Sequence, residues 1–416
     1  MNPLASPTPP MPALLALADG TWHRGHSCGA PGTAFGEIVF NTSMAGYQEI
    51  ATDPSYAGQV VCLTYPQQGN YGISPEASEA ARPALSALVV ADACRTPSHW
   101  RSRETLPSYL ARHGVVAVEG VDTRAVTLAV RGGGAMAAGV STEVLDPDEL
   151  VALVRAQPPI AERDLVAAVS CDAPWTETPA AGCGRSVAAV DCGQKAGIVA
   201  GLAARGLTVH TLPWDATAAD VLALGADGAF LSNGPGDPAS VPGVVACARG
   251  LLGRVPAFGI CLGHQVMALA AGARTVKLAY GHHGGNEPVM NLLTRTCEVT
   301  AQNHNYAVDF PSFGPLVPGE SGGRTSHEAD LRCWAERGVA PVALSPEVGR
   351  VRLTHVNLND GTCEGVEYLD RRAFSLQYHP EGRPGPLDGA YGFDAFCALM
   401  AGDPDYLVHA VQGRCA

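Results

Sequence analysis

One short segment near the middle of the chain limits the fold more than any other. Residues 256–260 form an apolar run, Pro-Ala-Phe-Gly-Ile, which leads into Cys261 and the sequence Leu-Gly-His-Gln-Val-Met-Ala. Glycine stands two residues before and two residues after the cysteine, at Gly259 and Gly263. This pattern predicts a nucleophile elbow, in which a strand turns sharply into a helix with the cysteine at the bend. Small residues let the helix pack close to the strand, and the partial positive charge at the helix N-terminus favours a thiolate.

Strands and helices alternate around this segment. Apolar strands are expected at 186–190, 208–212 and 228–231, and helices at 195–205, 217–224 and 241–252. This alternation predicts an α/β domain at 186–416, with a doubly wound, mostly parallel sheet. Ligands bind such sheets at the carboxyl ends of the strands. Cys261 and the loop 232–238 both fall at such ends.

The chain before this domain has a different pattern. Short strands broken by glycine and proline, such as 37–40, 60–64 and 87–90, accompany helical patterns near 108–113 and 146–157. Residues 13–171 are therefore expected to form an α+β domain, followed by a linker at 172–185 that is rich in Pro, Thr, Ala and Gly. Residues 1–12, rich in Pro, Ser and Ala, are expected to be disordered, and Asp19-Gly20 predicts a hairpin turn.

Composition excludes several classes of protein. The formal net charge is −13 without a block of Lys or Arg, which argues against binding to nucleic acid. No run approaches about 18 apolar residues, so no membrane span is expected, and no basic residue precedes the apolar run 11–18 as in a signal peptide. The 13 cysteines contain no C-x-x-C pair. They are expected to be reduced thiols of a cytoplasmic protein, mostly in the core, as at Cys62, Cys247 and Cys297.

A second group of residues completes the chemistry expected of Cys261. His379 ends a β-rich run and Glu381 follows two residues later. Alone, this histidine fits the end of a surface strand equally well, but beside an elbow cysteine it predicts a Cys-His-Glu triad. The loop Gly234-Pro235-Gly236 offers backbone N–H groups that, with the N–H of Leu262, predict an oxyanion hole. Lysine occurs only twice, at Lys195 and Lys277, and both lie in motif-like stretches, a hint that they have a role.

These motifs resemble those of class I (triad) glutamine amidotransferases. Five further segments resemble the small, glutamine-hydrolysing subunit of carbamoyl phosphate synthetase: 40–50, 52–56, 281–286, 302–309 and 355–362. The resemblance extends from about residue 13 to the C-terminus. It implies that Cys261 attacks the side-chain amide of glutamine and that His379 protonates the departing ammonia. It also implies a glutamine-binding set made up of Ser43, Gly234, Gly236, Leu262, Gln265, Asn303, Asn305 and Tyr306.

The resemblance further implies a partner. Ammonia would pass through an internal tunnel to a separate large subunit, which uses ATP, Mg and bicarbonate to make carbamoyl phosphate for arginine and pyrimidine biosynthesis. The sequence has no Walker-type loop, so the ATP sites are expected to lie on the partner. No cofactor and no metal is expected on this chain. Two alternatives stay open: the amidotransferase of another synthetase, and a non-enzymatic glutamine-sensing or scaffolding subunit. Pull-down of the large subunit distinguishes the first alternative, and the intact triad speaks against the second.

Some positions depart from the family pattern. Asn305 stands where a small residue is common, which a backbone contact would tolerate. His282 and His283 invite a metal interpretation, but adjacent residues cannot share one face of a strand, so a solvated turn is expected. Gln265 lies one helical turn after Cys261 and is expected on the same face. An insertion at about 310–350 is expected to be a surface excursion with a short helix at 327–337, and to leave glutamine hydrolysis intact.

Overall fold

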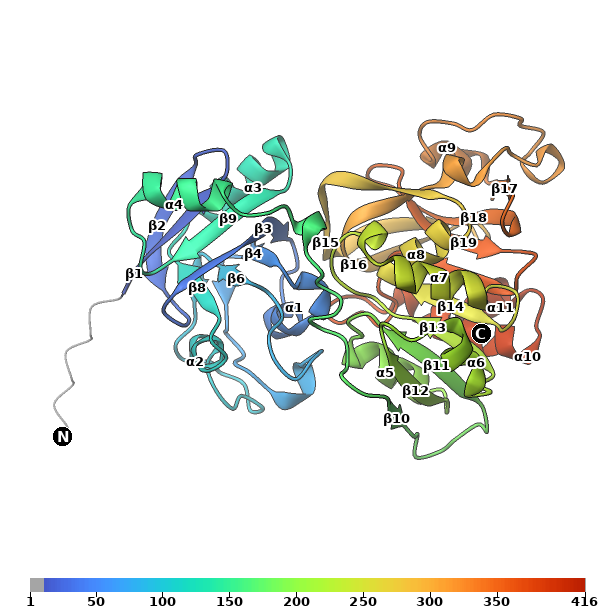
Figure 1. Cartoon of the computed structure of the whole chain (residues 1–416), viewed down its shortest axis with the longest axis horizontal. Coiled ribbons are helices and arrows are strands. Elements are labelled where there is room, and N and C mark those ends of the chain that lie inside the picture. Colours follow the sequence, from blue (N-terminus) through green and yellow to red (C-terminus); the bar gives the residue numbers. More distant parts are fainter. Residues whose placement is uncertain (1–10, 416) are drawn as a thin grey trace.

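The computed structural model of the protein describes residues 11–415 and contains two parts packed side by side (Figure 1). Strands β1 to β9 belong mainly to a barrel, and strands β10 to β20 form one large sheet. The disorder predicted for residues 1–10 lies outside the described residues. Pro12, predicted in the same segment, instead begins strand β1 (Pro12–Leu17).

The N-terminal part is a closed barrel. Around it the strands follow the order β1, β2 (Trp22–Ser27), β8 (Val116–Glu119), β6 (Ala87–Val89), β4 (Gln59–Leu63), β3 (Thr33–Asn41) and β9 (Met136–Ser141). Strands β3, β4, β6 and β8 pair in parallel, and the other neighbours are antiparallel. The predicted Asp19-Gly20 turn joins β1 to β2, and Asp19 Oδ1 accepts the Thr21 N–H at 2.7 Å. Closure of the barrel was not part of the α+β prediction.

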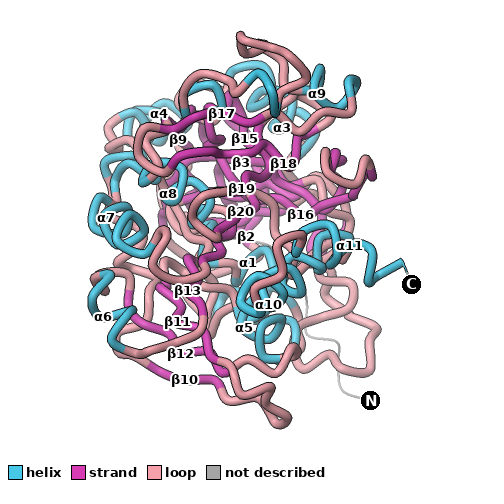
Figure 2. The backbone as a smooth tube through the Cα atoms, turned by 90° about the vertical axis from the view of Figure 1, so that its right-hand side faces the viewer, coloured by secondary structure: helices cyan, strands magenta, loops and turns pink. Residues whose placement is uncertain are grey.

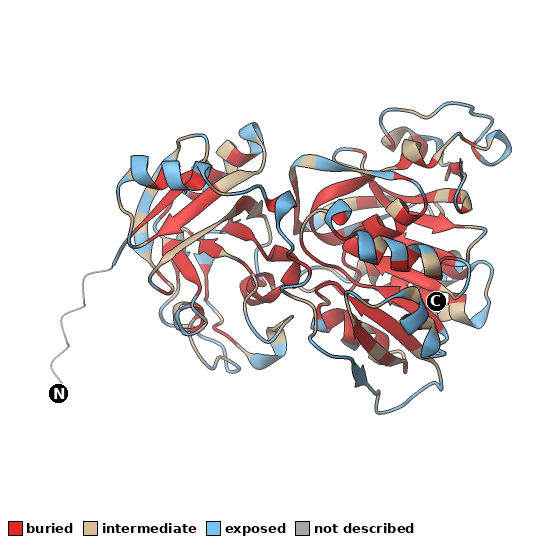
Figure 3. Cartoon of the chain, viewed as in Figure 1, coloured by how far each residue is buried: buried red, intermediate tan, exposed pale blue. Residues whose placement is uncertain are grey.

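Short helices and one small ladder complete this part. They are α1 (Tyr47–Thr52), α2 (Leu106–Arg112), α3 (Thr123–Gly133) and α4 (Pro147–Arg155), with the strand pair β5 (Gln67–Gln68) and β7 (Asp92–Ala93). Helices α2, α3 and α4 are capped at their N-termini by Thr105, Asp122 and Asp146, whose side-chain oxygens each accept a backbone N–H three residues later. Such caps satisfy donors that the first helical turn leaves free. The strands beneath these helices are buried (Figure 3).

The C-terminal part is built on an 11-stranded sheet. Its order is β10 (Trp175–Glu177), β12 (Thr208–Pro213), β11 (Ser186–Asp191), β13 (Gly228–Leu231), β14 (Ala257–Ile260), β20 (Ala373–Leu376), β19 (Cys363–Tyr368), β16 (Thr296–Asp309), β15 (Arg274–Asn291), β18 (Gly349–Asn357) and β17 (Val342–Ser345). Strands β12, β11, β13, β14 and β20 pair in parallel, and the remaining pairs are antiparallel. The prediction of a mostly parallel sheet was therefore too broad. After β15 the chain returns through hairpins, which need no helical crossover.

Helices cover both faces of the parallel strands (Figure 2). They are α5 (Ala196–Ala203), α6 (Ala218–Ala223), α7 (Pro242–Leu251), α8 (Leu262–Ala270), α10 (Tyr391–Ala401) and α11 (Tyr406–Cys415). Helices α6, α7 and α8 contribute to one buried apolar cluster, and α5, α10 and α11 to another. The two clusters hold the sheet between them and fix the ends of β13 and β14.

Two predicted irregular segments are more ordered than expected. Within the linker predicted at 172–185, strand β10 pairs antiparallel with β12 at the edge of the sheet. The insertion at about 310–350 carries helix α9 (Arg332–Arg337), inside the short helix predicted at 327–337, and strand β17. Trp334 of this helix is fully buried in the same apolar cluster as α7 and α8. The prediction of a surface excursion was wrong here, because the insertion adds an edge strand and part of the core.

Other expectations concern single residues. Cys62 and Cys247 are buried as predicted, whereas Cys297 is exposed. Twelve cysteines whose side chains the structure describes are free thiols. Across residues 11–415 we find no helix that is long and apolar enough to cross a membrane.

Candidate active site

Cys261 lies at a sharp bend between strand β14 and helix α8. Its backbone angles are φ 55° and ψ −105°, a conformation that residues other than glycine rarely adopt. A Cβ on Gly263 would lie 2.1 Å from the backbone oxygen of Leu231, and one on Gly259 would lie 2.8 Å from the carbonyl of Gly263. The flanking glycines are thus required by the close approach of helix to strand. The bend leaves Cys261 at the helix N-terminus, where the sequence predicted it.

His379 and Glu381 form the polar pair predicted beside this cysteine. His379 Nδ1 lies 2.7 Å from Glu381 Oε1, and both side chains are buried. Burial alone would lower the pKa of His379, but the Glu381 carboxylate and an interaction with the Cys261 thiol raise it to about 10. The site therefore stabilises the imidazolium, the form that follows proton transfer from a thiol.

Lys195 connects the His379–Glu381 pair to the barrel part. Its side chain is 2% exposed, and Nζ lies 2.8 Å from Glu381 Oε1 and 4.0 Å from Asp53 Oδ2 of the barrel part. Burial raises the pKa of Glu381, but Lys195 and His379 outweigh it and hold that pKa well below its usual range. Lys195 thus keeps Glu381 ionised. The scarcity of lysine was the one hint of this role in the sequence.

The loop after strand β13 carries the glycines that are predicted to form an oxyanion hole. A Cβ on Gly234 would lie 2.2 Å from the backbone oxygen of Cys192, so only glycine fits there. Gly236 has φ 88°, which favours glycine. Among residues 11–415, neither the Gly236 nor the Leu262 N–H donates to another backbone carbonyl in a turn or loop. These two N–H groups are therefore available to a ligand.

A cavity opens beside the Cys261 thiol. Most of the predicted glutamine-binding residues line it, together with residues of the barrel part: Gly234, Gly236, Cys261, Gln265, Asn303, His304, Asn305 and Tyr306, with Glu37, Ser55, Gln59 and Ile160. Ser43 does not line this cavity. It lines an adjoining pocket with His379, and Asn303 belongs to both. Leu262 lines neither of these two pockets.

Hydrogen bonds fix one wall of this cavity. Gln265 Nε2 donates to the backbone oxygen of Tyr306 at 2.7 Å. His283 lies 2.9 Å from Asn303 Oδ1 through Nδ1 and 2.9 Å from Asn305 Oδ1 through Nε2. Both asparagine side chains are therefore held by His283. The Cys261 thiol lies 3.6 Å from the backbone oxygen of Asn303.

The histidine pair that places this wall was misjudged from the sequence. His282 and His283 are buried in strand β15, and they do not form a solvated turn. Because successive strand residues face opposite sides, His283 reaches Asn303 and Asn305, while His282 reaches Asp360. The pairing of β15 with β16, which places both histidines, joins segments about 20 residues apart.

Comparison with known proteins agrees with this arrangement. The family model of the carbamoyl-phosphate synthase small chain, CPSase domain, matches residues 15–140, and that of class-I glutamine amidotransferases matches residues 188–319 and 328–399. The carbamoyl phosphate synthase small chain of Syntrophotalea carbinolica is 45% identical over 402 residues, covering 94% of this chain and 98% of the relative. The chain belongs to the carbamoyl phosphate synthase small chain family. The family predicted from the sequence is thereby confirmed.

Two further small chains are similar over nearly their whole length. That of Thermosynechococcus vestitus is 45% identical over 405 residues, with 94% of this chain and 97% of the relative covered. That of Thermotoga maritima is 44% identical over 389 residues, with 93% and 98% covered. The amidotransferase match is interrupted between residues 319 and 328, inside the insertion that carries α9. Only residues 320–327 of the insertion fall outside the match, whereas α9 and β17 lie within it.

Proposed function

We propose that this chain, as the small subunit of a carbamoyl phosphate synthase, hydrolyses the side-chain amide of glutamine at Cys261. One observation carries the proposal: a buried Cys-His-Glu arrangement sits at a nucleophile elbow, next to two backbone N–H groups and a polar cavity. These are the elements that covalent acyl transfer requires.

The reaction proceeds through two tetrahedral intermediates. The Cys261 sulfur attacks the amide carbon of glutamine while His379 takes the thiol proton. The N–H groups of Gly236 and Leu262 stabilise the oxyanion, and His379 then gives its proton to the leaving nitrogen. Ammonia departs and a γ-glutamyl thioester remains. A water molecule, deprotonated by His379, cleaves the thioester to glutamate and restores the thiol.

The cavity suggests how glutamine is held. Backbone groups of Gly234, Asn303 and Asn305 face the substrate, and Gln265 and Tyr306 form the adjacent wall. Glu37, the one carboxylate among the residues lining this cavity, pairs with Lys277 and accepts a hydrogen bond from Asn305 Nδ2 at 2.9 Å. We place the α-ammonium group of glutamine beside this carboxylate. Ser43 lies in the adjoining pocket behind Asn303, so we place its contact at the far side of the site.

The product implies a partner. Ammonia released at Cys261 is consumed in a separate large subunit, which binds ATP, Mg and bicarbonate and makes carbamoyl phosphate for arginine and pyrimidine biosynthesis. This chain itself requires no cofactor for glutamine hydrolysis. Its free thiols suit the reducing cytoplasm, where we place the complex.

The test uses the complex with the large subunit and compares two nitrogen sources. Cys261→Ala should abolish glutamine-dependent carbamoyl phosphate synthesis and leave ammonia-dependent synthesis unchanged. Cys297→Ala, which removes an exposed thiol outside the cavity, is the matched control and should retain both activities. Glutamine-dependent synthesis by the Cys261→Ala complex at the normal rate would refute the proposal.

A further inference from the structure

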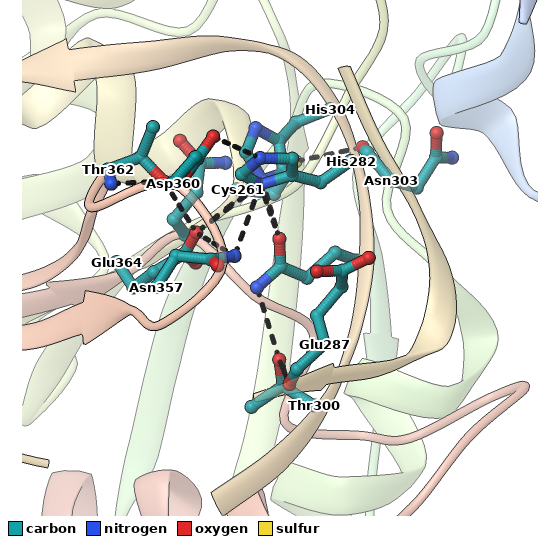
Figure 4. Close-up of polar contacts among 12 residues, drawn as sticks. Cys261, His282, Glu287, Thr300, Asn303, His304, Asn357, Asp360, Thr362 and Glu364 are labelled. Carbon is teal, nitrogen blue, oxygen red and sulfur yellow. Dashed lines mark hydrogen bonds and ion pairs between the residues drawn. The ribbon is translucent and has the colours of Figure 1, made fainter. Parts of the chain in front are cut away.

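A buried cluster of potential metal ligands lies beside the cavity wall. His282 of β15, His304 of β16 and Glu364 of β19 converge there, and one donor atom from each lies within 4.8 Å of the others (Figure 4). His304 and Glu364 are 5% and 0% exposed, respectively, and His282 is 8% exposed. The mechanism proposed for Cys261 uses none of these three side chains.

Each histidine is held by its outer nitrogen. Asp360 Oδ2 lies 2.8 Å from His282 Nε2, and the backbone oxygen of Tyr306 lies 2.8 Å from His304 Nδ1. A backbone oxygen only accepts, so His304 Nδ1 carries the hydrogen and Nε2 presents a lone pair to the cluster. Metal-bound histidines have this arrangement, with the outer N–H donated to a carboxylate or a backbone oxygen.

The centre of the cluster holds acceptors that face one another. His304 Nε2 lies 3.1 Å from Gln302 Oε1 and 4.0 Å from Glu364 Oε1. The amide of Gln302 is oriented by Thr300, whose hydroxyl oxygen accepts from Gln302 Nε2 and itself donates to a backbone oxygen. The second carboxylate oxygen of Glu364, Oε2, is buried and makes no hydrogen bond with the described residues. A cation would satisfy all of these groups at once.

We propose that His282 Nδ1, His304 Nε2 and the Glu364 carboxylate bind one divalent transition-metal ion, with Zn²⁺ the best match. Two imidazole nitrogens and one carboxylate are a common ligand set for zinc. His282 Nδ1 and Glu364 Oε1 are 3.5 Å apart, close to the ligand spacing of about 3.3 Å in a tetrahedron with bonds of about 2.0 Å. Gln302 Oε1, 2.8 Å from His282 Nδ1, lies near the fourth position.

The ion would have a structural role. It would join β15, β16 and β19 beside Asn303, His304 and Asn305, which line the cavity. The donor atoms come from three strands, and the insertion separates β16 from β19 in the sequence. No short spacing of ligand residues therefore indicates the site. This explains why the sequence predicted no metal on this chain.

The test measures metal binding by the full chain, freed of metal by chelation, with Zn²⁺ and Co²⁺ as probes. We expect one tightly bound Zn²⁺ per chain and a Co²⁺ complex with the visible absorption of a four-coordinate nitrogen and oxygen site. In Glu364→Gln, Zn²⁺ binding should weaken by about tenfold or more. The matched control, Glu367→Gln, removes another buried carboxylate of β19 that pairs with Arg352, and should bind Zn²⁺ like the natural chain.

Two results would overturn the site. One is a natural chain that takes up neither Zn²⁺ nor Co²⁺ in stoichiometric amount, which would make the cluster a network of hydrogen bonds and ion pairs alone. The other is Zn²⁺ affinity that is the same in Glu364→Gln as in the natural chain. The Co²⁺ spectrum is recorded on the natural chain, so it decides the question even when a variant does not fold.

Discussion

Replacing Lys195 by Met tests how the barrel part and the triad depend on each other. The substitution keeps most of the volume of the side chain and removes its charge. At the observed 2.8 Å between Lys195 Nζ and Glu381 Oε1, an effective dielectric constant of about 20 gives an attraction of about 6 kcal/mol. Desolvation offsets part of this, and breaking a buried pair costs about 3–5 kcal/mol in practice, because the remaining carboxylate is left unpaired.

The same substitution should affect catalysis. Without Lys195, the pKa of Glu381 rises. Glu381 then orients the His379 imidazole less well and stabilises its protonated form less. Loss of a triad carboxylate costs about 10⁴ in kcat, so a change acting through that carboxylate should cost about 10–100-fold. We expect a lower kcat with KM for glutamine changed much less.

Urea unfolding and glutamine hydrolysis measured on the same preparations check both effects. Arg352→Met is the control, since it also removes a cation from a buried carboxylate, Glu367, but lies away from the cavity. It should lose stability and keep its kcat. A Lys195→Met chain that is folded and retains the kcat of the natural chain would refute the coupling of Lys195 to the triad.

Three other changes probe the insertion, the substrate contact and the buried histidines. Trp334→Ala should lower the free energy of unfolding by about 3–5 kcal/mol, measured by urea unfolding; an unchanged midpoint would mean that α9 does not belong to the core. Glu37→Gln should raise KM for glutamine about tenfold and change kcat little, because about 1.4 kcal/mol of charge pairing is lost; an unchanged KM would remove Glu37 from the substrate site. Burial lowers the pKa of His264 to about 3, below its ordinary value of about 6.5. The unfolded chain therefore binds the extra proton as pH falls below 6.5, and stability should drop by about 2 kcal/mol between pH 7.5 and pH 5 through this residue. Urea midpoints at both pH values should show a smaller drop in His264→Gln, and an equal drop would contradict this source.

The positions of Cys261, His379 and Glu381 in the fold could be predicted because their signals are local. Gly259 is required by a 2.8 Å approach within its own strand–turn–helix unit, and Gly263 by a 2.1 Å approach to Leu231 of the neighbouring strand β13. Both requirements leave a short glycine pattern around Cys261. His379 and Glu381 are two residues apart, so their pairing follows from one segment. The parallel strands were visible for the same reason, since each alternates with a helix nearby in the sequence.

The remaining features depend on contacts between distant segments. Asp53 and Glu37 come from the barrel part and reach the site across more than a hundred residues, so no spacing revealed them. His283 is positioned by the pairing of two long antiparallel strands, and Trp334 by the packing of an insertion against helices of the sheet. Closure of the barrel likewise depends on pairing between β1 and β9, which local periodicity does not encode.

Identifying the covalent intermediate tests most directly whether Cys261 is the nucleophile. The full chain is mixed with glutamine, quenched in acid within one turnover, digested and analysed by mass spectrometry. We predict a glutamyl group on the peptide that carries Cys261 and on no other cysteine, and its absence in Cys261→Ala. Continued hydrolysis with the glutamyl group on another residue, or with no covalent adduct at any time, would contradict Cys261 as the nucleophile.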